Sequence, residues 1–250
     1  MTAIHIVLLV GILAGLAFLS WQDSRSYASF KLTDDSAVRI RFLARWTIVV
    51  FVLFGVGSVL LLLFLGRLDA VWSYPPEFAS LMVPVDTART KEVASFDGSV
   101  GKAFGFLIGM TITALVWRSR LKKARQPMLG DTQALLPRNW DEVATCVPLA
   151  INAGVSEELF FRLALPLLAF KATGSMTIAI GIALVAFGLA HWYQGWKGVL
   201  VTTAVGVLLF WLYLSSGSIV KPIAVHILFD VIALVIRPGI TLYRGERAAD

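Results

Sequence analysis

The sequence predicts an all-α fold, a polytopic transmembrane helical bundle of about seven spans, and three observations indicate this. Hydrophobic residues make up 58% of the 250 residues, charged residues only 15%, and the mean hydropathy is +0.78. These values lie outside the usual range of a soluble domain. The apolar runs extend along the whole chain, so we expect one bundle without a separate soluble domain.

Seven apolar runs approach the length of about 20 residues that a helix needs to cross about 30 Å of hydrocarbon. They are Ala3–Leu19, Trp46–Leu65, Ser99–Trp117, Val143–Phe170, Met176–Tyr193, Gly198–Leu214 and Ile219–Ile236. We therefore divide the chain into N-terminal helices and loops without a recognisable motif (1–142), a helical core (143–236) and a basic cytoplasmic tail (237–250).

Basic residues indicate the orientation. No Lys or Arg precedes the first run, whereas Arg25, Lys31, Arg39, Arg41 and Arg45 follow it, which favours an uncleaved anchor with its N-terminus outside. With that start, 15 of the 22 Lys and Arg residues fall on the cytoplasmic side, together with the C-terminus. We expect an integral, multi-pass protein of a prokaryotic plasma membrane, because the chain is short and basic and carries no targeting signal.

Two segments between the runs have a distinct character. Residues 36–46 read as the positive flank of the second span, with a short amphipathic helix along the inner interface as the alternative. Residues 67–97 contain Tyr74, Pro75, Pro76 and five acidic residues, and we expect an irregular external segment there.

Charge and cysteine content exclude several classes of protein. The formal net charge of +6 is explained by flanks of membrane spans, so we expect no nucleic-acid partner. Cys146 is the single cysteine, which excludes an internal disulfide, a zinc ribbon and a CxxC site.

An ionisable residue at the centre of a membrane span costs about 2.5 to 3.5 kcal/mol of insertion free energy. Such a residue is therefore expected to have an interaction partner or a functional role. Here such residues gather in three stretches: Glu157, Glu158 and Arg162 in SEELFFRL, His191 in AFGLAHW, and His226 with Asp230 in HILFD. Residues four apart share a helix face, so Glu158 meets Arg162 and His226 meets Asp230, while Glu157 points elsewhere. One carboxylate is thereby neutralised while its neighbour stays available.

Helix geometry also brings two of these groups to one depth. In an antiparallel hairpin that turns near Gly174, Glu157 and His191 are each 17 residues from the turn, about 25 Å at 1.5 Å per residue. His226 and Asp230 lie closer to a turn at Gly217, so their helix must be tilted or offset to join them. Such groups also serve simply to tie membrane helices together. Three carboxylates and two imidazoles are nevertheless the side chains from which hydrolytic and metal sites are built.

At these residues the sequence resembles the CPBP family of CAAX proteases and bacteriocin-processing enzymes, also called Abi, which includes the type II CAAX prenyl protease. Its EExxxR motif corresponds to Glu157, Glu158 and Arg162, its FxxxH motif to Phe187 and His191, and its HxxxN/D motif to His226 and Asp230. The three motifs occur in the family's order on separate spans, within about a third of the chain.

The resemblance implies an intramembrane endopeptidase that cleaves membrane-associated peptides with activated water and without an acyl-enzyme. Carried over, Glu157 is the general base, His191 assists it in polarising water, and Glu158 pairs with Arg162 behind them. In members with Asn in the last motif, the second His and that Asn stabilise the oxyanion. An ionised Asp230 cannot donate a hydrogen bond, so we expect it to turn toward His226 and keep it cationic as the main oxyanion donor.

Several alternatives stay open at the level of sequence. The family mechanism requires no cofactor, but Glu157, His191 and His226 also form a zinc-type ligand set. A non-catalytic scaffold or immunity protein and a proton-coupled transporter are the competing functions. The expected partners are the bilayer and a membrane-associated peptide or protein. A prenylated CAAX peptide is only the family's eukaryotic example, so the sequence leaves the substrate unidentified.

Overall fold

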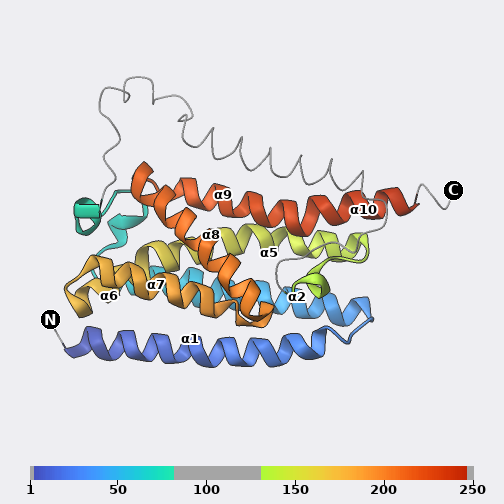
Figure 1. Cartoon of the computed structure of the whole chain (residues 1–250), viewed down its shortest axis with the longest axis horizontal. Coiled ribbons are helices and arrows are strands. Elements are labelled where there is room, and N and C mark those ends of the chain that lie inside the picture. Colours follow the sequence, from blue (N-terminus) through green and yellow to red (C-terminus); the bar gives the residue numbers. More distant parts are fainter. Residues whose placement is uncertain (1–2, 82–130, 247–250) are drawn as a thin grey trace, which may run out of the picture.

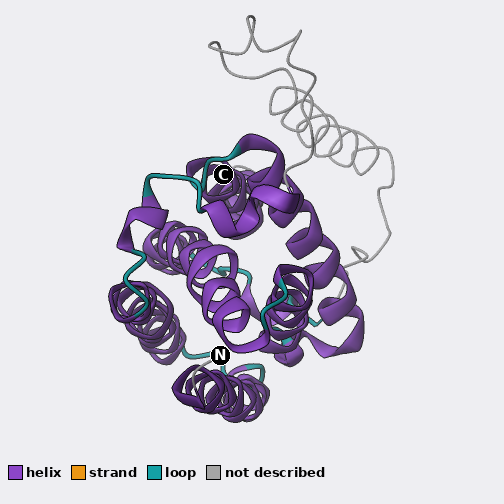
Figure 2. Cartoon of the chain, turned by 90° about the vertical axis from the view of Figure 1, so that its left-hand side faces the viewer, coloured by secondary structure: helices purple, strands orange, loops and turns teal. Residues whose placement is uncertain are grey.

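The computed structural model describes residues 3–81 and 131–246, and this part consists of helices and loops without a strand (Figure 2). Most helices run along the long axis of the molecule (Figure 1). The elements in chain order are α1 (Ala3–Phe30), α2 (Ser36–Val50), η1 (Phe51–Val56), α3 (Gly57–Phe64), η2 (Leu68–Val71), η3 (Pro76–Leu81), η4 (Gln133–Leu135), α5 (Trp140–Glu158), η5 (Leu159–Ala164), α6 (Leu165–Thr173), α7 (Met176–Ala190), η6 (Trp192–Gln194), α8 (Gly195–Ser216), α9 (Val220–Val231), η7 (Ile232–Ile236) and α10 (Arg237–Glu246).

The all-α membrane fold is confirmed. Four helices of the described part are long and apolar enough to cross a membrane, namely Ala3–Phe30, Ser36–Phe64, Trp192–Ser216 and Val220–Glu246, and Met176–Ala190 is a shorter apolar helix. Together with the continuous helix α5–η5–α6, they correspond to six of the seven predicted spans. The predicted span Ser99–Trp117 lies outside the described residues. Large apolar side chains also cover the outside of the bundle, as the lipid tails require.

Two helices extend beyond the predicted spans. The first runs to Phe30 instead of Leu19, and the last continues past Ile236 through α10 to Glu246. Much of the segment that we expected to be a basic tail is therefore helical. These ends are more polar than the apolar runs, so a count of apolar residues ends too early.

The positive flank of the second span is not a separate solvated segment. Residues 36–64 form one continuous helix, and Arg39 within it is fully buried. Its Nε atom lies 3.0 Å from Glu142 Oε2, and its guanidinium also donates to the carbonyl oxygens of Ala134 and Leu136. Arg39 thus joins α2 to α5 and to the loop that carries η4.

The opposite end of the bundle holds the turns after α6 and α8 and the short helices η2 and η3 (Figure 1). The segment from residue 67, which we expected to be irregular, begins with these two 3-10 helices, and residues 82–97 lie outside the described residues. Tyr74 packs beside Gly217, and burial raises the pKa of its phenol to about 12. Arg67 pairs with Asp69 and Glu77 and lowers the pKa of Asp69.

The helix α5–η5–α6 lies at the centre of the bundle, because α1, α2, α7 and α9 all pack against it. Two glycines bring its neighbours close. A Cβ atom at Gly154 would lie 2.5 Å from Ile227 Cγ1 and 2.8 Å from the Ile227 backbone nitrogen, so α5 and α9 almost touch there. A Cβ atom at Gly55 would lie 2.8 Å from Ser156 Oγ. Both contacts flank the EExxxR residues.

Candidate active site

Glu158 is the centre of a fully buried polar cluster. Its carboxylate lies 3.0 Å from Arg162 Nε, in the predicted i,i+4 pair, and both side chains have no exposed area. The same carboxylate accepts a hydrogen bond of 2.8 Å from His226 Nδ1, which comes from α9. Glu158 therefore joins two of the three motifs, whereas the sequence assigned it only to Arg162.

Arg162 is held in place by two aromatic rings as well as by its ion pair. Its guanidinium carbon lies 4.7 Å from the ring centroid of Phe187 and 5.7 Å from that of Phe210. Such contacts stabilise a buried cation by about 2 kcal/mol when water is excluded. Arg162 lies on the π-helical turn η5, a local widening of the helix that is frequent at functional sites.

The FxxxH motif fixes the protonation pattern of His191. His191 ends α7, and its Nδ1 atom lies 2.9 Å from the carbonyl oxygen of Phe187. A carbonyl oxygen only accepts, so Nδ1 carries the proton. In the neutral ring, Nε2 then offers a lone pair on the other side.

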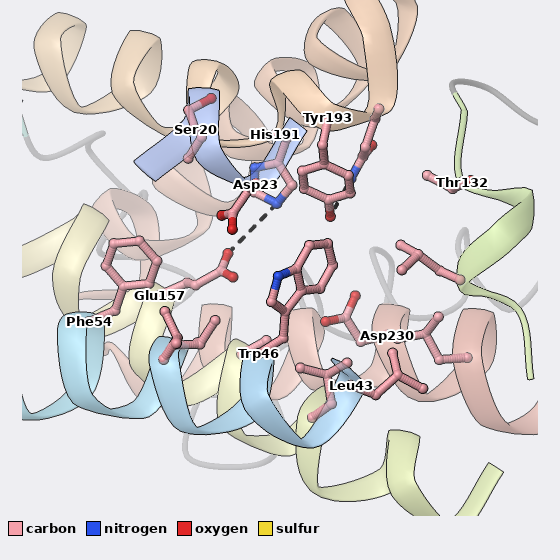
Figure 3. A pocket seen from close by; sticks show the side chains of 18 of the residues that line it. Ser20, Asp23, Leu43, Trp46, Phe54, Thr132, Glu157, His191, Tyr193 and Asp230 are labelled. Carbon is pink, nitrogen blue, oxygen red and sulfur yellow. Dashed lines mark hydrogen bonds and ion pairs between the residues drawn. The ribbon is translucent and has the colours of Figure 1, made fainter. Parts of the chain in front are cut away.

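His191 Nε2 faces Glu157, but the two groups do not bond to each other directly. Glu157 Oε2 lies 3.9 Å from this nitrogen, which is too far for a direct hydrogen bond (Figure 3). This oxygen is buried and has no hydrogen-bond partner in the described part of the chain. The two atoms come from the two helices of the predicted hairpin around Gly174, which does bring them close together.

Asp230 lies next to His226 but does not bond to it. Its Oδ2 atom is 3.7 Å from His226 Nε2, beyond a hydrogen bond, whereas Glu158 holds the other nitrogen at 2.8 Å. The helix α9 brings both residues to the cavity that Glu157 and His191 line. Glu158, not Asp230, is thus the closer carboxylate on His226.

These groups line one cavity of about 470 Å³. Glu157, His191, His226 and Asp230 contribute to its wall, while Glu158 and Arg162 lie behind it. A second, apolar cavity of about 460 Å³ lies between α1 and α7 and shares Leu16 and Ala190 with the first. The first cavity is therefore bordered by an apolar groove between α1 and α7.

The first two helices supply cavity residues that sequence reasoning missed. Asp23 on α1 and Trp46 on α2 line the cavity, and so does Tyr193, which lies two residues after the last residue of the FxxxH motif (Figure 3). We ended the first span at Leu19, so Asp23 fell outside it. The signal was nevertheless present, because Leu16, Ser20, Asp23 and Tyr27 follow the spacing of one helix face.

The donor set does not fit a metal site in this arrangement. Within residues 3–81 and 131–246, no group of three His, Cys, Asp or Glu side chains could hold a metal ion. Both imidazoles use Nδ1 for a hydrogen bond, and their Nε2 atoms face different carboxylates. A zinc ion at Glu157, His191 and His226 would need a rearrangement of these side chains, so we derive no step through a metal.

A comparison with protein families matches residues 139–232 to the family described as "Type II CAAX prenyl endopeptidase Rce1-like". The matched region begins at the residue that caps α5 and ends in η7, so it contains all three motifs. Comparisons with curated proteins and with solved structures find no match. The family resemblance predicted from the motifs is confirmed: residues 139–232 of this integral membrane protein match the type II CAAX prenyl endopeptidase Rce1-like family.

Proposed function

We propose that this protein is an intramembrane endopeptidase that hydrolyses a peptide bond of a membrane-associated substrate with water activated by Glu157 and His191. The observation that carries the proposal is the approach of Glu157 Oε2 to His191 Nε2 without a direct hydrogen bond between them. At 3.9 Å, one water molecule can contact both atoms at hydrogen-bonding distance. Glu157 Oε2 has no other described partner, and the cavity offers room for a peptide beside it.

The first step follows from the two acceptors. An ionised Glu157 and the Nε2 lone pair of His191 each accept one proton of the water, which leaves its oxygen lone pairs directed at the substrate. Glu157 removes one proton while the water oxygen bonds to the scissile carbonyl carbon. The electron pair of the carbonyl bond moves to its oxygen, which becomes the oxyanion of a tetrahedral intermediate. General base catalysis of this kind contributes about 10²- to 10⁴-fold to the rate.

His226 is the proposed oxyanion donor. Its Nδ1 proton is engaged by Glu158, so a cationic His226 would direct its second N–H, on Nε2, into the cavity. Glu158 and Asp230 are the two carboxylates beside this ring, and we assign them to balancing its charge. When the intermediate collapses, the carbon–nitrogen bond breaks and Glu157 gives its proton to the leaving amine, which restores the carboxylate.

The apolar groove suggests how a substrate reaches the site. The groove between α1 and α7 is lined by Leu13, Leu16, Val185 and Leu189, and it shares Leu16 and Ala190 with the cavity of Glu157 and His191. An apolar segment or lipid chain of a membrane-bound peptide fits such a surface. The basic residues around the end of the bundle opposite Gly174 remain our reason for proposing a cytoplasmic C-terminus in a prokaryotic plasma membrane.

The test is cleavage of a membrane-anchored peptide library by the reconstituted protein, with Glu157→Gln as the matched variant. The wild type is expected to cleave, and Glu157→Gln to lose about 10²- to 10⁴-fold in kcat. A scaffold or immunity protein would tolerate this substitution. Proton-coupled uptake that depends on Glu157, without cleavage of any peptide, would instead favour the transporter.

A further inference from the structure

Asp23 lies in the catalytic cavity but outside the region that matches the family. It comes from α1 and lines the same cavity as Glu157 and His191 (Figure 3). Three residues earlier, Ser20 Oγ donates a hydrogen bond of 2.6 Å to the carbonyl oxygen of Leu189. This bond fixes α1 against α7 two residues before His191. The position of Asp23 relative to the proposed water site is therefore set by direct contact between the two helices.

The carboxylate of Asp23 lies near the indole of Trp46 on α2, which also lines the cavity. The nearby cation is Arg45, an exposed residue. Within the described ranges, Asp23 forms no ion pair with Lys, Arg or His. An ionised carboxylate in a largely apolar cavity is stabilised when a cation enters and pairs with it. Trp46 lines the same cavity, and an indole ring attracts a cation that approaches its face.

The charged residues that line the whole cavity also favour a cationic ligand. Three acids, Asp23, Glu157 and Asp230, line it, against one permanently charged base, Arg237. Glu158 and Arg162 behind the wall neutralise each other. Even when His226 is cationic, the net charge of the ionised residues in the lining is −1. A cleft with a surplus of one sign concentrates ligands of the opposite sign.

We propose that Asp23 and Trp46 form a cation-binding subsite that selects substrates with a Lys or Arg side chain near the scissile bond. The inference rests on the proposed function, since it names the substrate class of the same site. The aliphatic stem of such a side chain would lie along Leu16 and Leu19, with its charged head at Asp23. Lysine and arginine combine an apolar stem with a cationic head, which matches this lining.

The experiment compares membrane-anchored peptides that carry Lys, Gln or Glu at one position, moved residue by residue along each side of the cleaved bond. The wild type is expected to prefer Lys to Gln by about 10- to 100-fold in kcat/KM at the position that meets Asp23, as for a charged hydrogen bond. Asp23→Asn should bring this ratio close to one while the Gln peptide is still cleaved. Asp23→Lys should invert it in favour of Glu. The control Asp141→Asn removes an exposed charge outside the cavity and should keep the wild-type ratio.

Binding can be measured apart from cleavage by comparing the dissociation constants of the Lys and Gln peptides for the Glu157→Gln protein. This comparison tests the subsite independently of the proposed chemistry. A preference for Lys that depends on Asp23, without hydrolysis by the wild type, would support the subsite and contradict the proposed function. Cleavage with equal rates for Lys and Gln at every position would overturn the subsite. So would an Asp23→Asn protein that cleaves both peptides more slowly at an unchanged ratio, because Asp23 would then serve only to hold α1 in place.

Discussion

Removing one member of the buried Glu158–Arg162 pair should destabilise the protein strongly. Both side chains have no exposed area, and Nε and Oε2 lie 3.0 Å apart. Breaking such a pair leaves an uncompensated charge and costs about 3 to 5 kcal/mol. For a chain of this size, 1 kcal/mol corresponds to about 2 to 4 °C in Tm, so Glu158→Gln or Arg162→Met should lower Tm by about 6 to 20 °C.

Replacing both members should restore much of the stability but not the activity. The double variant Glu158→Leu/Arg162→Met removes both buried charges, and apolar replacements of a buried pair are often neutral or stabilising. Activity should stay low, because His226 Nδ1 loses the acceptor that lies 2.8 Å away. Thermal unfolding in detergent and peptide cleavage measure the two properties separately.

Two results would refute this reasoning. If Glu158→Gln melts at the wild-type temperature, the pair carries no buried charge that needs a partner. If the double variant melts as low as the worse single variant, the loss comes from packing around Phe187 and Phe210 rather than from an unpaired charge.

Three further predictions follow from the same contacts. Gly154→Ala should cost about 1 to 3 kcal/mol of unfolding free energy, because the added Cβ would meet Ile227. The control Gly181→Ala, whose added Cβ would have no atom within 4 Å, should be neutral or slightly stabilising in a thermal unfolding assay. Equal effects of the two substitutions would contradict the close packing of α5 on α9. Asp230→Asn should change kcat by less than about tenfold, or 1.4 kcal/mol, because Asp230 lies 3.7 Å from His226 Nε2 while Glu158, at 2.8 Å from Nδ1, still balances the charge of His226. A larger loss in a pH-rate profile would restore to Asp230 the orienting role that we expected from the sequence. A chelator should leave the rate of peptide cleavage unchanged, and loss of activity that added zinc restores would return the metal to the site.

Local spacing predicted the parts of the site that depend on one helix or one hairpin. The i,i+4 rule gave the Glu158–Arg162 pair, and equal distances from Gly174 gave the approach of Glu157 to His191. Both follow from the regular rise of a helix and the short turn of a hairpin. The sequence contained this geometry because no distant packing is needed to define it.

The remaining features depend on packing between distant helices. Glu158 meets His226 because Gly154 lets α9 approach α5, and no spacing within either helix specifies that contact. Arg39, which we assigned to the positive flank of the second span, is buried and pairs with Glu142 on another helix. Asp23 was missed because α1 continues past its apolar run. In each case the partner is set by tertiary packing.

The most direct test of the account is a double-mutant cycle on the two groups that are proposed to share one water. We would measure kcat/KM of membrane-anchored peptide cleavage for wild type, Glu157→Gln, His191→Gln and the combined variant, with Tm as the control for folding. Each single variant should lose about 10²- to 10⁴-fold. The combined variant should be no slower than the worse single one, because both substitutions disable the same water. Losses that multiply, or a single variant with wild-type activity, would contradict joint activation of one water by Glu157 and His191.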